Sequence, residues 1–381
     1  MRILRDLRKV QPRPSCVTFG VFDGVHLGHQ SLLRRTVELA RQHGLRSVAL
    51  TFDPIPEVVL RGVGVPLLTT NSEKAALIRQ AGIDLLVIAR FDRAFASITP
   101  LRFINEVLIG RLGARIVIAG PRTRFGHLAR GDLRFLKQSG KRLGLQVEGV
   151  PAVVHGGQQV SSSVARQLLA TGSVAMMRGH LGRPYSLTGR VVPGAGRGRN
   201  IGFPTANLRI SPEKMLPPDG VYAACAIIGD ERFPAAVNIG TRPTFEKGRA
   251  LPRAIEAHVL APCGNLIGRT ITLELLTRLR SERRFATIEA LRKQIARDCA
   301  RTLKHFSRTR PARRTKGSSA RRVAKRLPGQ RLALRRGLLE EALAIQREVL
   351  AWRGGRGLRQ SSTPLIRRDR DMLSRGRRPR G

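Results

Sequence analysis

One stretch near the start of the chain restricts the possible folds more than any other. The apolar run that begins at Val17 is followed by Phe-Asp-Gly and then by His-Leu-Gly-His at 26–29, where a helical pattern starts. This order predicts a strand, a tight turn and a helix N-terminus, where backbone N–H groups and the helix dipole favour phosphate. His26 and His29 add two imidazoles, and Gly28 leaves room for a ligand between them. A solvent-facing histidine pair is the simpler alternative.

Strand and helix patterns alternate from residue 16 to residue 170. Strands are expected at 16–21, 47–52, 85–89 and 116–119, and helices at 30–43, 70–82, 99–113, 133–143 and 161–172. Thr70 with Glu73 forms a capping box, and Thr99-Pro100 is an N-cap with proline at the first helical position. Buried strands between amphipathic helices predict a parallel sheet with helices on both faces, whose ligands lie beyond the carboxyl ends of the strands.

A second cluster of hydroxyl groups is expected at the same edge of the sheet. Ser161, Ser162 and Ser163 follow an extended run and begin a helix, and Arg166 follows one turn later. With the two histidines, these groups suit an adenylyl transfer, in which donors and cations stabilise the charge on phosphorus and on leaving pyrophosphate. An N-cap cluster without a ligand is the alternative reading of the serines.

The pattern changes after about residue 182. Strands are expected at 185–192, 222–228, 233–239, 255–260 and 270–276, with hairpin turns at Gly229-Asp230 and at 263–265. Helical periodicity returns only at 288–306, so a small antiparallel barrel closed by one helix is expected. Gly-Arg-Pro at 182–184 is the expected hinge, which divides the chain into domains at 1–180 and 181–306, followed by a tail at 307–381.

The tail is rich in basic residues and ends in Arg-Gly-Arg-Arg-Pro-Arg-Gly. We expect it to be disordered apart from one amphipathic helix at 332–352. The net charge of the whole chain is +44, from either an arginine-rich coding bias or an affinity for polyanions. Only 4% of the residues are aromatic, and no motif that reads DNA or RNA is present, so nucleic acid is expected to bind only non-specifically through the tail.

Several classes of protein are excluded. The four cysteines are far apart and form no metal-binding spacing, which predicts reduced thiols. The first residues lack the apolar segment of a secretory signal, and no apolar run has the length of a membrane span, so a cytoplasmic protein without a membrane partner is expected. No Walker loop is present, and the glycine-rich segment 194–199 does not match Gly-x-Gly-x-x-Gly, so other segments are expected to hold nucleotide.

The most informative segment of the second domain is Gly-Phe-Pro-Thr-Ala-Asn at 202–207. Thr205 and Asn207 lie on the same side of an extended chain and offer oxygen ligands of the kind that Mg²⁺ accepts. A turn whose polar groups satisfy the backbone is the alternative. Glu256 lies in an expected strand, and its spacing alone favours an exposed strand face over a general base.

Several motifs together resemble the bacterial bifunctional riboflavin kinase/FMN adenylyltransferase family, the FAD synthetases, over residues 15 to 306. They are Phe-Asp-Gly-Val-His-Leu-Gly-His-Gln from residue 22, Thr-Phe-Asp-Pro from 51, Leu-Gly-Arg-Pro-Tyr from 181, Gly-Phe-Pro-Thr-Ala-Asn-Leu from 202, Asn-Ile-Gly-Thr-Arg-Pro-Thr-Phe from 238 and Arg-Arg-Phe from 283. The resemblance implies a Rossmann-like nucleotidyltransferase domain followed by a six-stranded riboflavin kinase barrel. It also implies the substrates and products riboflavin, FMN, FAD and ATP, with Mg²⁺ as cofactor.

The resemblance also assigns roles. His26 and His29 would stabilise the ATP phosphates during FMN adenylylation, and Glu256 would take the proton of the riboflavin 5′-hydroxyl. The remaining implied nucleotide-binding residues are Phe19, Gly20, Gly24, Ser161, Ser162, Ser163, Arg166, Gly202 and Pro204. Thr205 and Asn207 would hold Mg²⁺–ATP, and Arg283 and Phe285 would contact the flavin.

The chain departs from the family pattern only in its first domain. Ile55 replaces a histidine, Arg122 replaces an acid, Thr123 replaces an aromatic residue and Val164 replaces an arginine. These differences motivate an alternative, a riboflavin kinase whose adenylyltransferase domain is inactive. Restoring the acid at 122 and the arginine at 164 would then switch on FAD formation.

Overall fold

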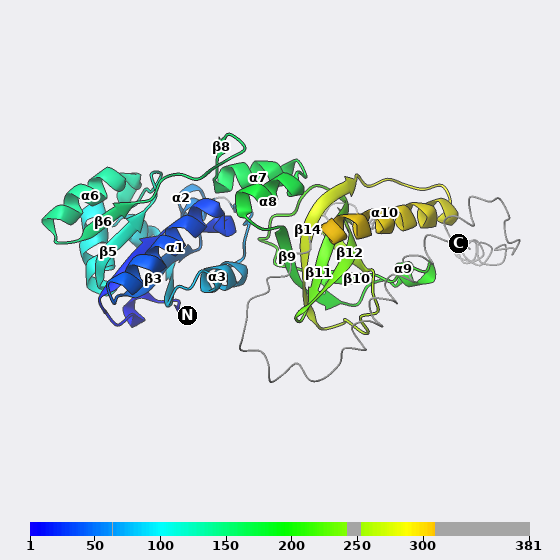
Figure 1. The fold of residues 1–381 in the computed structure, drawn as a ribbon, viewed down its shortest axis with the longest axis horizontal. Coiled ribbons are helices and arrows are strands. Elements are labelled where there is room, and N and C mark those ends of the chain that lie inside the picture. Colours follow the sequence, from blue (N-terminus) through cyan, green and yellow to red (C-terminus); the bar gives the residue numbers. More distant parts are fainter. Residues whose placement is uncertain (63, 242–252, 309–381) are drawn as a thin grey trace, which may run out of the picture.

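The structure is a computed structural model that describes residues 1–62, 64–241 and 253–308. A parallel sheet with its helices lies at one end and a β-barrel at the other, as Figure 1 shows. Helices α7 (Ser162–Ala170) and α8 (Val174–Leu181) lie between them. The expected combination of a parallel α/β domain and an antiparallel barrel is confirmed.

The sheet of the first domain has six parallel strands in the order β1-β4-β3-β2-β5-β6. The strands are β1 (Arg2–Leu4), β2 (Ser15–Phe19), β3 (Arg46–Asp53), β4 (Leu85–Arg90), β5 (Ala114–Ala119) and β6 (Gln146–Gly149). All five residues of β2 are buried; Val17 and Phe19 join one hydrophobic cluster and Cys16 joins another. Because alternate residues of a strand face opposite sides, the sheet is covered on both faces, as expected.

Helices and short helical turns connect these strands. The helices are α1 (Leu27–Gln42), α2 (Pro56–Arg61), α3 (Asn71–Gln80), α4 (Arg93–Ala96), α5 (Pro100–Arg102) and α6 (Leu133–Arg142). Single 3₁₀ turns are η1 (Leu7–Lys9), η2 (Asp23–Val25) and η4 (His127–Ala129), and η3 (Phe103–Arg111) is a π-helix that follows α5 directly. The short strands β7 (Val154–His155) and β8 (Gln158–Gln159) pair with each other. The capping box of Thr70 and Glu73 and the N-cap at Thr99 are both confirmed.

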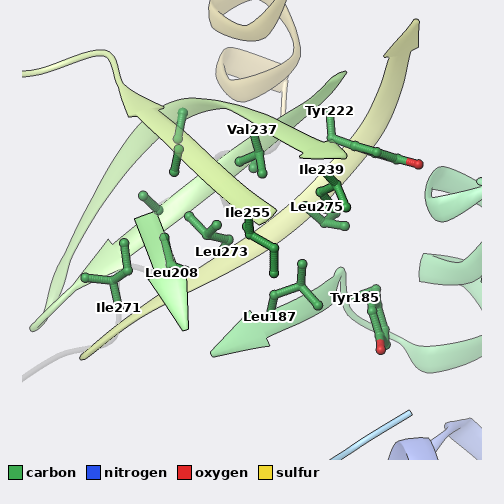
Figure 2. Packing of buried hydrophobic residues seen from close by; sticks show 14 of the residues in the cluster. Tyr185, Leu187, Leu208, Tyr222, Val237, Ile239, Ile255, Ile271, Leu273 and Leu275 are labelled. Atoms are coloured by element: carbon green, nitrogen blue, oxygen red, sulfur yellow. The ribbon is translucent and has the colours of Figure 1, made fainter. Parts of the chain in front are cut away.

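The second domain is a closed barrel with strand order β10-β13-β12-β11-β14-β9. Its strands are β9 (Tyr185–Val192), β10 (Ala206–Arg209), β11 (Gly220–Ile228), β12 (Glu231–Thr241), β13 (Arg253–Val259) and β14 (Thr270–Arg280). Alternate apolar side chains such as Leu187, Ile255 and Leu273 fill its interior, as Figure 2 shows. Helix α10 (Ile288–Arg308) packs on β11, β12 and β14, and α9 (Arg197–Asn200) is one short turn.

One expected hairpin is present and the other is not. Residues 229–230 join β11 directly to β12, because Ile228 pairs with Glu231. The hairpin expected at 263–265 is wrong, since β13 pairs with β10 and β12 whereas β14 pairs with β11 and β9. Turn residues there reverse the chain only locally. The pairing partners of the two strands are set by closure of the barrel, which removes free edges.

The junction between the domains, where a hinge is expected at 182–184, is packed on both sides. Val174, Met177 and Leu181 of α8 share a buried cluster with Tyr185 and the barrel interior. Residues 182–184 themselves are exposed or half-buried, between a buried helix end and a buried strand start. The expected hinge stays a prediction, and any movement there would have to separate these buried contacts.

Other expectations concern the cysteines, the membrane and the tail. Cys16, Cys225 and Cys299 are buried free thiols, and Cys263 is half-buried. Among the described helices, none is both long enough and apolar enough to cross a membrane. The basic tail and its helix at 332–352 lie outside the described residues.

Candidate active sites

The turn between β2 and α1 has an unusual backbone conformation. Phe22, Gly24 and Val25 have φ angles of 50°, 78° and 39°, in the left-handed region. The buried carboxylate of Asp23 accepts hydrogen bonds from the backbone N–H groups of Leu68 and Thr69 at 3.1 and 2.9 Å. A turn of this kind persists only where its surroundings hold it, and such turns concentrate at ligand sites.

The two histidines meet at the N-terminus of α1. His26 is the N-cap, and its Nδ1 accepts a hydrogen bond from the backbone N–H of His29 at 3.3 Å. The rings stack with their centroids 3.6 Å apart. Because Nδ1 of His26 accepts, the proton of the neutral ring is on Nε2, which can donate to an anion. Nδ1 of His29 is buried and has no hydrogen-bond partner among the described residues.

Burial and nearby cations keep both imidazoles neutral at pH 7. Burial, with smaller effects from the charges of Arg122 and Arg183, lowers the pKa of His26 to about 4. The pKa of His29 is well below its ordinary value because of burial, with smaller effects from His26 and Lys74. The N-terminus of α1 with His26 and His29 forms a site that we name the helix mouth. It combines polar donors with nearby fixed positive charge, which suits a polyphosphate.

The serine segment lies beside this turn. Ser161 is the N-cap of α7, and its Oγ accepts a hydrogen bond from the N–H of Val164 at 3.3 Å. Oγ of Ser162 donates to the backbone oxygen of Asp23 at 2.9 Å. A Cβ at Gly28 would lie 3.2 Å from the ring of His26 and 4.0 Å from the carbonyl oxygen of Val160. The structure thus brings the N-termini of α1 and α7 together, and Ser163 is exposed.

Several predicted nucleotide-binding residues are already engaged within the protein. Arg166 forms an ion pair with Asp23 at 2.6 Å, so its guanidinium braces the turn. The side chain of Phe19 packs edge-on against Phe103 in the core, which leaves only its backbone at the site. Gly24 is buried, and its N–H donates to Oγ1 of Thr69 at 2.9 Å. Gly20 directly follows β2, and its N–H donates to the backbone oxygen of Leu50 at 3.0 Å.

The four departures from the family pattern lie in different surroundings. Ile55 is buried, and Val164 lies in the first turn of α7. Oγ1 of Thr123 accepts a hydrogen bond from the N–H of Gly120 at 3.0 Å and closes a turn. Arg122 lies close enough to His26 to lower its pKa. The departure at 122 therefore adds positive charge to the helix mouth.

The barrel places three polar residues in one lateral row. Asn207 of β10 pairs with Glu256 of β13, which pairs in turn with Asn238 of β12. Paired residues on adjacent strands share a face, and the neighbours Ile255 and Ala257 point into the core, so this row lies on the outer face. Asn207 is buried and Glu256 is half-buried.

A cleft of about 1740 Å³ opens beside this row. It is lined by residues 191–196, 199–207 and 257–267, together with part of α10. A Cβ at Gly194 would collide with the side chain of Asn207, and one at Gly198 would collide with the backbone oxygen of Phe203. Glycine is thus required at both positions, because neighbouring atoms approach too closely for a side chain. The glycine-rich segment 194–199, which does not match Gly-x-Gly-x-x-Gly, therefore belongs to this site.

The residues present fit a hard cation. Oγ1 of Thr205 would lie 3.2 Å from a Cβ at Gly198, so the loop approaches both Thr205 and Asn207 without covering them with a side chain. Hydroxyl and amide oxygens are ligands that Mg²⁺ accepts when substrate phosphates complete its shell. No cluster of three or more histidine, cysteine or acidic residues suited to metal occurs in the described part of the chain. A cation here would therefore depend on the nucleotide.

Arg283 and Phe285 lie in the loop before α10. The guanidinium of Arg283 lies 4.7 Å from the ring centre of Phe285, and its Nη2 donates to Oε1 of Gln294 at 2.5 Å. The adjacent Glu282 accepts a hydrogen bond from Nδ2 of Asn238 at 3.1 Å. This contact brings the loop against the end of the row that contains Glu256.

Sequence reasoning missed three residues of these sites. Lys74 of α3 is buried, and its Nζ donates to Oγ1 of Thr51 at 3.4 Å beneath the helix mouth. Asn238 is placed only by strand pairing, and Arg183 contacts the turn from the other domain. Of these three residues, only Lys74 could have been noticed in the sequence, because it is a lysine on the apolar face of the helix expected at 70–82. The positions of Asn238 and Arg183 could be found only from the tertiary structure.

Comparisons with known proteins agree with this arrangement. The FAD synthetase family model matches residues 8–164, and the riboflavin kinase family model matches residues 181–306. The bifunctional riboflavin kinase/FMN adenylyltransferase of Escherichia coli K12 is 35% identical over 317 residues, 82% of this chain and 100% of that protein. The Bacillus subtilis protein of the same name is 34% identical over 308 residues, 80% of this chain and 96% of that protein.

A solved structure has the same architecture over both domains. The crystal structure of a protein described as a macrolide-efflux protein from Streptococcus pneumoniae superimposes with a TM-score of 0.72 and 28% identity. It covers 81% of this chain and 99% of its own. Both domain matches, their order and the identity over nearly the whole length of the relatives lead to one assignment. The chain belongs to the bifunctional riboflavin kinase/FMN adenylyltransferase family, with an FAD synthetase domain followed by a riboflavin kinase domain.

Proposed function

We propose that the named residues carry out two successive reactions on flavin. In the barrel, riboflavin and ATP give FMN and ADP; in the α/β domain, FMN and a second ATP give FAD and pyrophosphate. The observation that supports this most is the presence of two separate sites in one chain, the imidazole pair at a helix mouth and the glycine-lined cleft that includes Asn207, the strand partner of Glu256. We keep the domain bounds 1–180 and 181–306 as part of the proposal.

In the barrel, Glu256 is the proposed general base. Its carboxylate accepts the proton of the riboflavin 5′-hydroxyl as that oxygen attacks the γ-phosphorus of ATP and the bond to the β-phosphate oxygen breaks. Thr205 and Asn207 hold the nucleotide with Mg²⁺, which when bound neutralises charge on the phosphate oxygens. Gly202 and Pro204 fix the turn that carries them, and both line the cleft.

In the α/β domain, positioning and charge stabilisation are the whole of the proposed catalysis. A phosphate oxygen of FMN attacks the α-phosphorus of ATP, the bond to the β-phosphate breaks, and pyrophosphate leaves. His26 donates from Nε2 and His29 from a ring N–H, while the N-termini of α1 and α7 bind phosphate oxygens. Ser161, Ser162 and Ser163 are proposed to complete this surface.

The flavin and the location complete the proposal. Arg283 and Phe285 present a flat cation–aromatic pair near Glu256, a surface on which a flavin ring can stack. The buried free thiols of Cys16, Cys225 and Cys299 suit a reducing compartment, so we propose the cytoplasm as the place of action.

One assay tests both halves. The protein is incubated with riboflavin, ATP and Mg²⁺, and riboflavin, FMN and FAD are separated by chromatography over time. We expect FMN to appear first and FAD to follow, and both to require Mg²⁺. FMN that accumulates without FAD would contradict the second reaction and favour a kinase with an inactive adenylyltransferase domain. FAD formed from added FMN without conversion of riboflavin would contradict the first.

A further inference from the structure

We infer that Arg183 is a positioning residue for FMN adenylylation, although it belongs to the segment that matches riboflavin kinase. It holds the backbone of the turn directly before His26 in the conformation that aims the imidazole pair. The inference rests on the function proposed above for the helix mouth, and it makes the barrel domain part of the adenylyltransferase site.

The turn requires such support. Val25 is β-branched and has φ at 39°, a conformation that is strained for residues of this kind. Phe22 also has a positive φ, at 50°. His26 follows immediately and is the N-cap of α1, so any relaxation at Val25 moves the imidazole and the first turn of the helix together. Such strain persists only where hydrogen bonds to the turn compensate for it.

Arg183 supplies those hydrogen bonds from outside the α/β domain. Its Nη2 donates to the backbone oxygen of Gly24 at 2.7 Å, and its Nη1 donates to the backbone oxygens of Val25 and Leu181, each at 3.1 Å. Within the described residues it forms no ion pair with a carboxylate. Burial lowers its pKa to about 10 against the opposing effect of the charges of Glu73 and Glu274, so it stays charged at pH 7.

A second side chain, Gln30 of α1, makes the matching contact from within the first domain. Its Nε2 donates to the backbone oxygens of Val25 and Leu181 at 2.9 and 2.8 Å. Arg183 and Gln30 therefore share two acceptors, one on the turn and one at the end of α8. This arrangement ties the turn to the junction from both sides and predicts that the two side chains are energetically coupled.

The barrel fixes the position of Arg183. Tyr185, two residues later, is buried in the barrel core, and its hydroxyl donates to the backbone oxygen of Met215 at 2.6 Å. In the same region Lys214 is buried and donates to Glu73 of α3 and to the backbone oxygen of Leu68 at 2.6 and 2.7 Å. The two domains are joined by these buried polar contacts, so the guanidinium has little freedom to follow a relaxing turn.

The first experiment compares Arg183→Met with Arg183→Lys and the control Arg178→Met in the full chain. Arg178 is an exposed arginine of α8, and its substitution removes the same charge without touching the turn. We expect Arg183→Met to lower kcat for FAD formation from FMN by about 10²-fold, the cost of a small misplacement, and Arg183→Lys to lower it by about tenfold. The KM for ATP should change by less than about threefold, and Arg178→Met should match the wild type.

Riboflavin kinase activity in the same samples separates positioning from folding. We expect the rate of FMN formation from riboflavin to stay within about twofold of wild type in Arg183→Met, because Arg183 contacts no residue of the cleft. Lys214→Met provides a second comparison, since it weakens the domain junction and leaves the bonds to Gly24 and Val25 in place. If Lys214→Met lowers kcat for FAD as much as Arg183→Met does, Arg183 acts only through domain docking and the inference is wrong.

A double-mutant cycle with Gln30→Met gives an independent test. Because both side chains hold Val25, their effects on kcat for FAD formation should not add, and the double variant should lose at least threefold less than the product of the single losses. Wild-type protein that forms no FAD would refute the proposed function itself. Wild-type protein that forms FAD at a rate unchanged by Arg183→Met would refute the inference alone.

Discussion

The two candidate sites are proposed to carry out phosphate chemistry by opposite means. The helix mouth of the α/β domain gathers neutral imidazoles among the cations Arg122, Arg183 and Lys74, and its one buried acid, Asp23, is already paired with Arg166. The barrel site has a carboxylate, Glu256, between two asparagines on a rigid sheet. The first site is built to stabilise negative charge, and the second also offers a base.

This difference follows from the chemistry that each site is proposed to perform. A phosphate oxygen of FMN is already anionic and needs no base, so the first site needs donors and positive charge. A riboflavin hydroxyl must lose a proton as it attacks, so the second site needs an acceptor. The backbone differs in the same way, because the first site depends on a strained turn and the second on regular strand pairing.

The largest effect is expected when the proposed general base of the barrel site, Glu256, is removed. Glu256→Gln should lower riboflavin phosphorylation by about 10²- to 10⁴-fold, the usual contribution of a general base. FAD formation from supplied FMN should stay unchanged, as measured by chromatography with each substrate in turn. Glu231→Gln, at an exposed carboxylate of β12, is the matched control. A loss of both activities would show that the two sites are not independent.

The converse substitution acts on the helix mouth. His29→Asn should lower FAD formation by about 10²- to 10³-fold, the cost of one oriented donor to the transition state. Riboflavin phosphorylation in the same sample should be unaffected. His127→Asn, at an exposed histidine of the same domain, should match the wild type. Equal losses in the two histidine variants would remove the special role given to the imidazole pair.

A smaller effect is expected from the glycine-rich loop. In Gly194→Ala the added methyl group collides with Asn207, so the amide must move. A displacement that costs about 1.4 kcal/mol in binding raises the KM for ATP of the kinase reaction about tenfold. Gly64→Ala, where a Cβ meets no atom within 4 Å, is the control. An unchanged KM in Gly194→Ala would place the nucleotide away from this loop.

The smallest expected effect is that of pH on kcat for FAD formation, which we expect to be nearly absent. His26 has its pKa lowered to about 4, so it stays neutral as the pH falls from 8 to 5.5. A histidine with the ordinary pKa of about 6.5 would be mostly protonated at the lower end. We expect kcat for FAD formation to change by less than about twofold over this range through His26. An NMR titration of the His26 ring with a midpoint near 6.5 would contradict the buried, neutral pair.

Parts of both sites were predictable from sequence because they depend on local rules. The strand before Gly20, the helix start at His26 and the N-cap at Ser161 each follow from turn and capping chemistry within a few residues. The motif around Thr205 was identified for the same reason. By contrast, the sequence patterns missed the strand β10 and wrongly predicted a hairpin at 263–265. Both features depend on which strands pair, and turn residues do not encode the partner.

Charge was the property that sequence described least well. Arg166 pairs with Asp23 beneath the turn, a contact that its place in the sequence did not indicate, and its role in nucleotide binding stays a prediction. Arg122 differed from the family pattern, and only its position beside His26 gives that difference a meaning. Which arginine meets a carboxylate and which meets a ligand depends on distances across the fold, because an ion pair gains its energy from contact and burial.

The sequence by itself determined the two domain classes, the order of the domains and the residue types at each site, because periodicity, caps and short motifs act over a few neighbouring residues. Only the tertiary structure decided that Asn207, Glu256 and Asn238 share a row and that Arg183 clamps the turn of the other domain. The physical reason is that strand register and burial are properties of the closed, packed chain. The junction expected to be a hinge is an example, because its apolar and polar contacts with both domains could be seen only in the folded chain.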